Sequence, residues 1–392
     1  MIIYEFKLYG TQEQYQAINE CIKVSQFMRN KALKKWMDSK DSEQKENRYS
    51  LNGLSKTLAK EFDFVKALNS SARQAGAERA WSSIKRFYDK KARYPKFQHD
   101  NRSVEFKISG WKLSDDYKKL TIKSCDVGTL KMKGTRDLQS FSTDKIKRVR
   151  LLRRADGYYV QFCINAERKI KHAFTGKAVG IDVGLNSFLT DSNGEPIDNP
   201  RFLRKSEKRL KRFQRRFSKK KDGSENKKEA RGKLARLHLK VSRQRKDFAI
   251  KTARQVITNS DFVGIEDLRI SNMVKNRKLA KSISDASWRA FRTWLEYFGE
   301  ICGVRVVAVS PAYTSQMCSS CGALVKKGLE CRVHECSCGC VMDRDENAAK
   351  NILTKALRLW GTQIHKTLLE RSPLHREVLM QVVSLKEESA GL

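Results

Sequence analysis

The sequence lacks the long apolar runs and the proline-rich stretches that mark several classes of protein. No run of about 18 apolar residues occurs, and no amphipathic segment pairs its charge with an exposed aromatic face, so we expect no membrane partner. Only 5 prolines argue against long disordered linkers. The opening stretch, MIIYEFKLYG, alternates like a strand and lacks the layout of a signal peptide, so we expect a cytoplasmic protein.

Acidic residues are also scarce. The 392 residues include 81 Lys and Arg against 44 Asp and Glu, which gives a formal net charge of +37. Such a charge repels itself in a compact chain unless a polyanion neutralises it, so nucleic acid is the expected partner. The length exceeds the usual size of a single core, and we therefore expect two or three domains.

The first half of the sequence changes between strand and helix patterns. Phe6 and Leu8 alternate with charged residues in the opening strand, and a helical pattern then runs from about residue 11 to residue 88. Strand patterns return beyond residue 95 and end in a hairpin whose Asp156-Gly157 pair is a favoured two-residue turn. We predict a small β-barrel that the first strand begins, a helical insert interrupts and the later strands complete.

A strongly basic stretch, residues 201 to 246, holds 21 Lys or Arg against 4 Asp or Glu. Leu210, Phe213 and Phe217 form one helical stripe, KKDGSEN supplies a turn, and Leu234 and Leu237 belong to a second stripe. The stretch therefore predicts a basic helical hairpin. A charge run is usually only a solvated face, but this density of one sign needs a counter-charge, so we expect nucleic-acid contacts. The candidate contact residues are Arg209, Arg212, Arg216 and Lys228.

Acids at the ends of apolar strands are the main sign of catalysis. Asp182 lies in the strand pattern AVGID, and Glu266 ends the strand pattern SDFVGIE. An aspartate in an apolar strand is costly to bury unless a cation or hydrogen-bond donors meet it. A third acid, Asp343 or Asp345, opens the alanine-rich helix of DRDENAAKNI, and the residues alone do not decide between these two. Three such carboxylates suit a two-metal nuclease, for which Mg²⁺ is the expected ion.

Six of the ten cysteines lie between residues 318 and 340, which in a cytosolic protein indicates metal binding rather than disulfides. Cys318 and Cys321 form a C-x-x-C knuckle, and Cys336 with Cys338 forms a C-x-C partner about fifteen residues on. Four thiolates make a closed tetrahedral site, so we predict a structural Zn²⁺. The remaining candidate ligands are Cys331, Cys340 and His334.

Five segments, in their order and spacing, resemble the TnpB family of RNA-guided DNA nucleases, which small transposons carry and which is similar to the nuclease half of type V CRISPR effectors. They are GIDVGLNSF, the basic hairpin ending in QRKDF, GIEDLRISNMVKNRKLAKSISDASW, SPAYTSQMCSSCG and CSCGCVMDRDENAAKNI. The resemblance covers nearly everything from Lys177 to Leu353. It implies an RNase H-like, RuvC-type domain whose catalytic, Mg²⁺-binding acids are Asp182, Glu266 and Asp345, and so it selects Asp345 over Asp343.

The resemblance also implies an α+β multidomain organisation. Residues 1–10 and 96–172 would form a wedge β-barrel, interrupted by a helical recognition lobe at residues 11–95. Residues 173–316 and 341–360 would form the RuvC-like nuclease domain, and residues 317–340 a zinc-binding insertion that contacts target nucleic acid. Residues 361–392 would be a tail, to which no role is assigned.

The implied partners are a guide RNA from the transposon end, with one protein chain per RNA, and a double-stranded DNA target. Gln74 lies where family members can place a base-reading side chain, and glutamine can bond an adenine edge bidentately. A solvated helix residue is an equally good interpretation of Gln74. Arg344 is a further candidate nucleic-acid contact.

The implied function is that of an RNA-guided endonuclease that cleaves double-stranded DNA beside a short flanking motif. Two alternatives remain open. A nuclease-silent RNA-guided regulator is disfavoured because all three matching acids are present. A guide-free RuvC-like resolvase would share the metal chemistry, but it has no evident need for so large a basic surface or for a recognition lobe.

Overall fold

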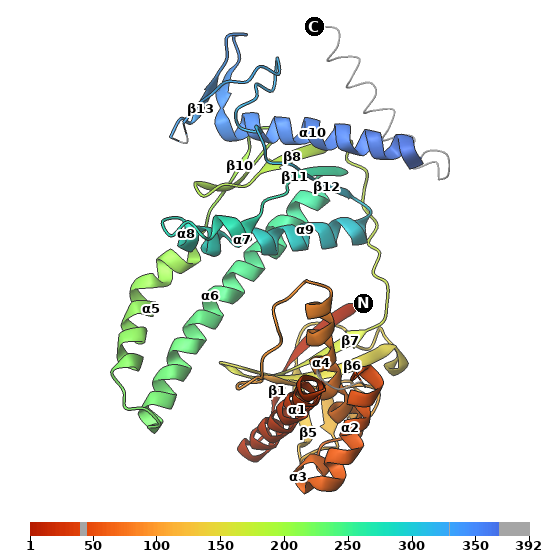
Figure 1. The fold of residues 1–392 in the computed structure, drawn as a ribbon. Helices are drawn as coiled ribbons and strands as arrows, with labels where there is room; N and C mark the ends of the chain where they lie inside the picture. Colours follow the sequence, from red (N-terminus) through yellow and green to blue (C-terminus); the bar gives the residue numbers. More distant parts are fainter. Residues whose placement is uncertain (40–44, 329, 368–392) are drawn as a thin grey trace. The chain divides into compact units, whose positions relative to one another are not determined.

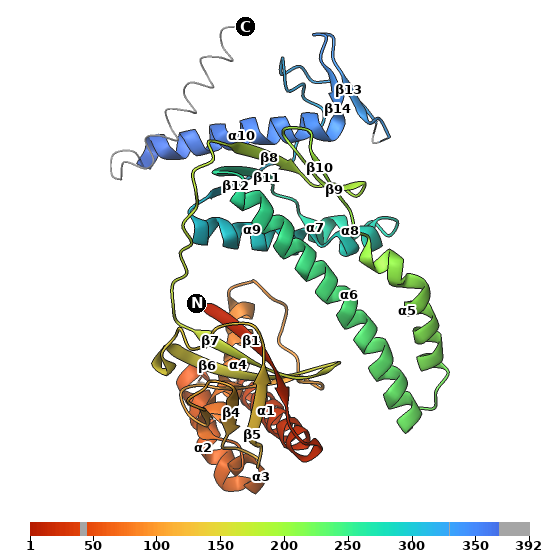
Figure 2. The ribbon, with the colours of Figure 1, turned by 180° about the vertical axis from the view of Figure 1, so that it is seen from behind.

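The computed structural model describes residues 1–39, 45–328 and 330–367. The expected tail at residues 361–392 therefore lies almost entirely outside the described residues. The chain divides into two compact units, one ending at Arg168 and the other beginning at Lys169 (Figures 1 and 2). Within the described ranges, no helix combines the length and the apolar character that crossing a membrane requires.

Helices make up the first part of the N-terminal unit. They are α1 (Gln12–Asp38), α2 (Arg48–Glu61), α3 (Asp63–Lys66) and α4 (Ser70–Tyr88). The N-terminus of α1 is a capping box, because the Thr11 side chain accepts a hydrogen bond from the Gln14 backbone and the Gln14 side chain accepts one from the Thr11 backbone. Asn47 caps α2 in the same way. The helical pattern predicted between residues 11 and 88 is thus confirmed.

A seven-stranded antiparallel sheet forms the rest of this unit. Its strands are β1 (Ile2–Tyr9), β2 (Ser103–Phe106), β3 (Trp111–Leu113), β4 (Lys119–Ile122), β5 (Gly128–Lys133), β6 (Ile146–Arg154) and β7 (Gly157–Ile164). They lie in the order β2-β6-β7-β1-β5-β4-β3, with a 3₁₀ turn at Thr143–Lys145 before β6. As predicted, the first strand joins strands that follow the helices, since β1 lies between β7 and β5.

The sheet is a half-barrel, so the prediction of a small β-barrel is confirmed only in part. The edge strands β2 and β3 have only four and three residues and do not pair with each other. Helix α1 covers the apolar side chains of the sheet instead, with Ile18 and Ile22 buried in one cluster with Phe6 and Phe162. Because a helix removes this surface from water, the edges need not meet in order to bury it.

A mixed five-stranded sheet is the centre of the C-terminal unit. Its strands are β8 (Ala178–Asp182), β9 (Ser187–Asp191), β10 (Pro196–Asp198), β11 (Phe262–Glu266) and β12 (Arg305–Val309), in the order β10-β9-β8-β11-β12. The central pairs β8–β11 and β11–β12 are parallel, and β9 and β10 are added by antiparallel hairpins. The three apolar runs that the sequence shows therefore form β8, β11 and β12, which are neighbours in the sheet.

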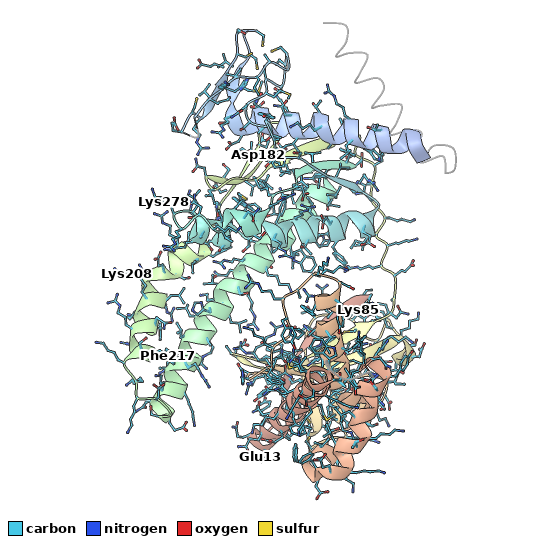
Figure 3. All side chains as sticks on the ribbon, viewed as in Figure 1. Glu13, Lys85, Asp182, Lys208, Phe217 and Lys278 are labelled. Carbon is cyan, nitrogen blue, oxygen red and sulfur yellow. The ribbon has the colours of Figure 1, made fainter. Side chains whose placement is uncertain are left out.

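The helices of this unit include the basic hairpin that the sequence predicts. They are α5 (Phe202–Ser218), α6 (Glu225–Thr258), α7 (Ile270–Met273), α8 (Ala280–Ala286), α9 (Trp288–Cys302) and α10 (Arg344–Thr367). Leu210 of α5 is buried against Leu234 and Leu237 of α6, which confirms both predicted stripes. Lys208 and Phe217 mark α5 in Figure 3. A short hairpin, β13 (Val333–Glu335) and β14 (Val341–Asp343), runs directly into α10.

Helix α10 covers one face of the five-stranded sheet, and α6 and α9 cover the other (Figure 1). The contact with α10 is very close, because two glycines face this helix. A Cβ added at Gly180 of β8 would overlap the Ala349 carbonyl oxygen, and one at Gly264 of β11 would lie 2.8 Å from Ala356 Cβ. The missing side chains therefore let the backbone of α10 lie directly on β8 and β11.

We expect Gly180→Ala to lower the free energy of unfolding by about 1–3 kcal/mol, because overpacking forces α10 away from β8. Gly232→Ala is the matched control. Gly232 lies inside α6 with no atom within 4 Å of an added Cβ, so this change should be neutral or stabilise by about 0.5–1 kcal/mol. Urea unfolding of both variants measures the difference, and equal midpoints would show that α10 does not depend on this contact.

Candidate functional site

Asp182 and Glu266 lie at the carboxyl ends of two paired parallel strands. β8 ends at Asp182 and β11 ends at Glu266, with Ile181 opposite Ile265. Side chains alternate along a strand, so each acid shares the face of the glycine two residues before it, which is the face that α10 covers. Figure 3 labels Asp182 at this position beside α10. The structure thus brings both acids to one end of the sheet.

The third acid lies in the first turn of α10, and Asp343 and Asp345 differ in what they contact there. Asp343 Oδ1 accepts hydrogen bonds from the backbone N–H of Asp345 at 2.7 Å and of Glu346 at 3.2 Å, so Asp343 caps the helix. Asp345 Oδ2 would lie 4.0 Å from a Cβ on Gly184, two residues beyond Asp182. Asp345 is therefore the acid that faces the end of β8.

The three carboxylates interact, and each has a raised pKa. Burial, together with the negative charges of Glu266 and Asp345, raises the pKa of Asp182 to about 8, although Arg344 opposes this rise. Burial also raises the pKa of Glu266, against a hydrogen bond from Thr314. For Asp345, burial and the charge of Asp343 raise the pKa. Ionised acids in this arrangement repel one another unless a cation lies between them.

Three residues that sequence reasoning missed contact these acids or act on them through their charge. Thr314 Oγ1 donates a hydrogen bond of 2.6 Å to Glu266 Oε1. Arg332, from the edge of β13, lies 3.7 Å from Asp345 Oδ2, and its side chain is half exposed. Lys355 Nζ donates to the Ala312 carbonyl at 2.5 Å, and its charge lowers the pKa of Glu266. None of the three follows an alternation or a motif spacing, so no sequence signal marks them.

This donor set fits hard divalent cations. Carboxylate oxygens are the ligands that Mg²⁺ prefers, and an ion bound here would offset the burial of the three carboxylates and the repulsion that Asp182 receives from Glu266 and Asp345. A basic hollow of about 510 Å³ also adjoins the loop that follows Asp182, starting at Leu185. Its cations are Arg201, Arg204, Lys278 and Lys281. An anionic polymer that passes through this hollow would come close to the acids.

The cysteine cluster is a compact group of four thiols. The Sγ atoms of Cys318, Cys321, Cys336 and Cys338 all lie within 4.8 Å of one another. Sγ of Cys318 is 3.8 Å from that of Cys338, and Sγ of Cys321 is 3.6 Å from that of Cys336. A tetrahedral zinc with Zn–S bonds of about 2.3 Å requires sulfur separations of about 3.8 Å. The cluster therefore fits one tetrahedral metal ion.

The other three candidate ligands lie outside this group. The Cys331 thiol donates to the Val333 carbonyl at 3.2 Å, and Cys340 is not one of the four. His334 is fully buried, with its Nδ1 against Lys327 Nζ. Although burial opposes the shift, backbone N–H groups and the His334 side chain lower the pKa of Cys318 to about 5, which favours a thiolate ligand.

Two buried asparagines of α10 connect the cysteine cluster to the acidic site. Asn347 accepts from the Ser319 backbone at 2.9 Å and donates to the Met317 carbonyl at 2.8 Å. Asn351 donates to the carbonyls of Thr314 and Met317. The loop that carries Cys318 is thus held by the helix that carries Asp345, so the two candidate metal sites share one support.

The residues proposed to contact nucleic acid from the basic hairpin lie on its exposed surface. Arg209, Arg212 and Arg216 line a shallow hollow of about 620 Å³ along α5. Lys228, at the start of α6, forms an ion pair of 2.5 Å with Glu225. Arg344 is half-buried, and its guanidinium donates to the Gly328 and Cys331 carbonyls, so it holds the cysteine segment against α10.

Gln74 lies on α4 and is half-buried. Its Oε1 lies 3.5 Å from Lys107 Nζ, and Lys107 Nζ is also 2.8 Å from Glu78 Oε1. The amide therefore has a neighbour that can fix its orientation, which a freely solvated glutamine would not have.

Two family models match adjoining parts of the chain, between residues 161 and 352. Residues 161–277 match OrfB_IS605, described as "Probable transposase", and residues 288–352 match the TNB domain of the Cas12f1-like family. Among solved structures, the chain is similar to Cas12f1 in its complex with a single guide RNA and target DNA. That match has a TM-score of 0.55 at 16% identity and covers 87% of this chain and 83% of the other, so it shows a shared fold.

Curated relatives extend the likeness over most of the chain. A Streptomyces pristinaespiralis protein, provisionally named an RNA-guided DNA endonuclease, is 31% identical over 363 residues, which are 90% of this chain and 89% of the relative. InsQ of Escherichia coli K12, with the same provisional name, is 28% identical over 70% of this chain and 71% of its own length. By this similarity over nearly its whole length, the chain belongs to the TnpB family, as the sequence motifs predicted.

Proposed function

We propose that this chain, an endodeoxyribonuclease of the TnpB family, is guided by an RNA from the transposon end and cleaves double-stranded DNA beside a short flanking motif. The relatives named as RNA-guided DNA endonucleases and the Cas12f1 fold support guide RNA and target DNA as its partners. The formal charge of +37 supports a polyanionic partner of large extent.

The observation that carries the nuclease proposal is that Asp182, Glu266 and Asp345 lie where α10 covers the sheet, each with a raised pKa, and that the charges of Glu266 and Asp345 contribute to the raised pKa of Asp182. These three residues would hold two Mg²⁺ ions, which when bound supply an activated water and stabilise the leaving oxygen of a phosphodiester. Thr314 would fix the orientation of the Glu266 carboxylate through its hydrogen bond. The basic hollow beside Leu185 would hold the phosphates of the strand that reaches the acids.

We expect Asp182→Asn to abolish cleavage of a DNA target complementary to the copurified RNA, while binding of that target stays nearly unchanged. The reason is that one metal-holding carboxylate is lost, but the shape and charge of the protein are kept. Asp343→Asn is the matched control and should retain cleavage, because asparagine caps a helix as well as aspartate does. Gel-resolved cleavage and a binding assay measure both properties.

The same preparations separate the alternatives. Sequencing should find one discrete RNA species in the purified protein, and ribonuclease treatment before target addition should abolish cleavage. Cleavage that survives the removal of RNA would identify a guide-free resolvase, and guide-dependent binding without cleavage by the wild type would identify a nuclease-silent regulator. Metal-dependent cleavage by Asp182→Asn would refute the assignment of the site.

We expect the stability of the metal-free protein, relative to the Asp182→Asn variant, to fall as pH rises from about 4 to about 8 and to level off above about 8. In the unfolded chain the carboxyl of Asp182 ionises near its usual pKa of 3.8, whereas in the folded state it stays protonated up to about pH 8. Its contribution to stability is therefore fully present below the unfolded pKa, is lost between the two pKa values and does not change further at higher pH. Melting temperatures between pH 6 and pH 9 measure this difference, at about 2–4 °C per kcal/mol. Added Mg²⁺ should raise the melting temperature of the wild type more at pH 9 than at pH 6, and parallel curves for both proteins would contradict the assignment.

We propose that the four-cysteine group holds a structural Zn²⁺, and we expect about one zinc per chain. Cys318→Ser should remove this zinc and lower the melting temperature, because a closed thiolate site contributes directly to folding. Cys331→Ser is the matched control, since its thiol lies outside the group, and it should keep the zinc. Elemental analysis of the purified variants measures the content, and loss of zinc from Cys331→Ser would disprove this ligand set.

A further inference from the structure

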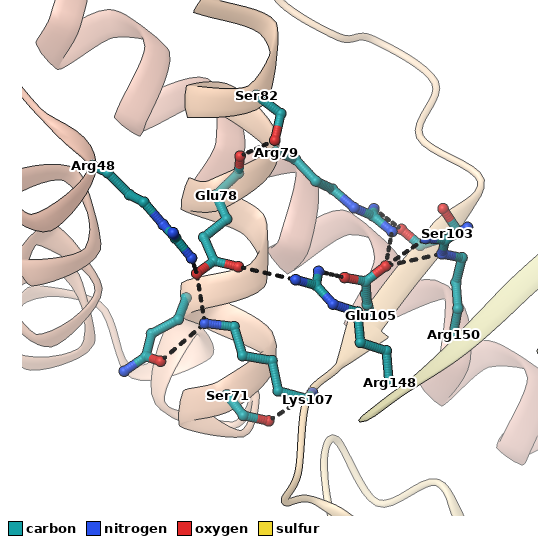
Figure 4. A network of polar contacts seen from close by, with 11 residues as sticks. Arg48, Ser71, Glu78, Arg79, Ser82, Ser103, Glu105, Lys107, Arg148 and Arg150 are labelled. Carbon is teal, nitrogen blue, oxygen red and sulfur yellow. Dashed lines mark hydrogen bonds and ion pairs between the residues drawn. The ribbon is translucent and has the colours of Figure 1, made fainter. Parts of the chain in front are cut away.

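Cations outnumber carboxylates where α2 and α4 meet β2 and β6 in the N-terminal unit (Figure 4). Glu78 of α4 accepts from Arg48 Nη2 at 2.9 Å and from Lys107 Nζ at 2.8 Å. Glu105 of β2 pairs with Arg148 and accepts from Arg150 Nη2 at 2.6 Å. Arg79 Nη2 lies 3.9 Å from Glu105 as well. Two carboxylates thus organise five cationic side chains from four elements.

The carboxylates lie beneath the cations. The Glu105 side chain is 3% exposed and that of Glu78 is 11% exposed, whereas the side chains of Arg48 and Arg148 are 54% and 41% exposed. Although burial opposes it, hydrogen bonds from Arg150 and Arg148 lower the pKa of Glu105, so this carboxylate stays ionised. Each buried carboxylate therefore holds guanidinium groups in fixed positions while much of their surface remains accessible.

Three of these cations, Arg48, Arg79 and Arg148, border a hollow of about 290 Å³ together with Lys85. Its charged lining consists of Arg48, Arg79, Lys85 and Arg148 against the single carboxylate of Glu78, a formal excess of three positive charges. Burial lowers the pKa of Arg79 and the positive charges of Arg150 and Arg148 lower it further, although the charge of Glu105 opposes this shift. A bound anion would relieve this repulsion, so the protein's own carboxylates do not complete the site.

The shape and chemistry of this lining suit a phosphate group. A guanidinium presents several N–H donors in a planar fork that matches phosphate oxygens, and Arg48 gives only Nη2 to Glu78 among the contacts of the described residues. Holding the arginines in place before binding lowers the entropy lost when the phosphate enters. A carboxylate ligand would use the same donors, but a chain of charge +37 meets phosphates as the repeating unit of its nucleic-acid partner.

The position of the hollow on α4 points to duplex DNA. Gln74, Glu78, Arg79 and Lys85 follow one another along this helix, and Gln74 precedes Glu78 by one turn, about 6 Å. Lys107 connects the two, because its Nζ contacts both Glu78 Oε1 and Gln74 Oε1. A duplex whose base edge meets Gln74 would therefore bring its own backbone to the hollow.

We propose that this hollow is a binding site for a backbone phosphate of the DNA duplex that flanks the target. This proposal rests on the proposed function and deepens it. It assigns two parts of the recognition of the flanking duplex, backbone binding and base reading, to different residues. Arg48 and Lys85 would hold the backbone whatever its sequence, and Gln74 would read a base edge.

The test uses the guide-loaded Asp182→Asn protein and a DNA duplex that is complementary to the copurified RNA and carries a flank selected from a randomised pool. Arg48→Ala combined with Lys85→Ala removes two exposed cations and leaves Glu78 paired with Lys107 and Arg148. We expect weaker duplex binding, with the slope of log affinity against log salt reduced by about 1 and the preference among flanks unchanged. Affinity for the guide RNA and the melting temperature should not change.

Lys56→Ala combined with Lys60→Ala is the matched control, because it removes the same charge from exposed positions of α2 outside the hollow. Gln74→Ala should give the opposite pattern, a lost flank preference with an unchanged salt slope. An unchanged slope in the Arg48 and Lys85 variant would overturn the phosphate site and leave only a structural network. Weaker guide RNA binding would assign the hollow to RNA and would also overturn the proposal. Absence of any guide-dependent duplex binding by the parent protein would instead refute the proposed function.

Discussion

The close contact between α10 and the five-stranded sheet is the constraint on which the candidate active site depends. Gly180 and Gly264 leave no side chain between the helix and strands β8 and β11, so α10 lies directly on both strands and its first turn reaches the end of β8. Each glycine precedes a proposed catalytic acid by two residues, which places the acid on the same face. The two glycines thus determine how close α10 lies to the sheet, and their positions in the strands place both acids on the face that α10 covers. A side chain at either glycine would move Asp345 away from Asp182 even though neither acid had changed.

The three buried acids lower the stability of the metal-free fold, and the cations next to them offset only part of this loss. Burial raises the pKa values of all three, and the charges of Glu266 and Asp345 add to the rise for Asp182. The nearest cations are few: Arg332 and Arg344 by Asp345, and Lys355 by Glu266. The apolar contacts of α10, with Ile352, Ala356 and Trp360 packed on Phe262 and Val307, supply the stability that holds the acids together. The arrangement of these acids therefore favours metal binding and lowers the stability of the metal-free fold. In the N-terminal unit, Glu78 and Glu105 show the reverse balance, with cations in excess over buried carboxylates.

Alternation and helical periodicity predicted the strands, the basic hairpin and the early strand that joins a later sheet, because each is a local pattern with a fixed period. They did not predict the open edge of the first sheet, since closure depends on whether β2 and β3 meet, and that is decided by what covers the sheet. The choice between Asp343 and Asp345 came from the family resemblance; the structure adds a physical reason, because Asp343 caps the helix. Thr314, Arg332 and the asparagines Asn347 and Asn351 reach the site only through tertiary contacts, so no spacing could reveal them.

The run of cysteines directly before two aspartates in CSCGCVMDRDEN has a structural explanation. The turn with Cys336 and Cys338 leads into β14, β14 ends at Asp343, and Asp343 caps α10, whose first turn carries Asp345. Asn347 and Asn351 bind the loop of Cys318 from the other side, so the thiol cluster and the helix N-terminus support each other. A soft-metal site next to a hard-metal site therefore makes physical sense. Thiolates around one ion fix the backbone that enters α10, and this backbone fixes where the carboxylate of Asp345 lies relative to Asp182.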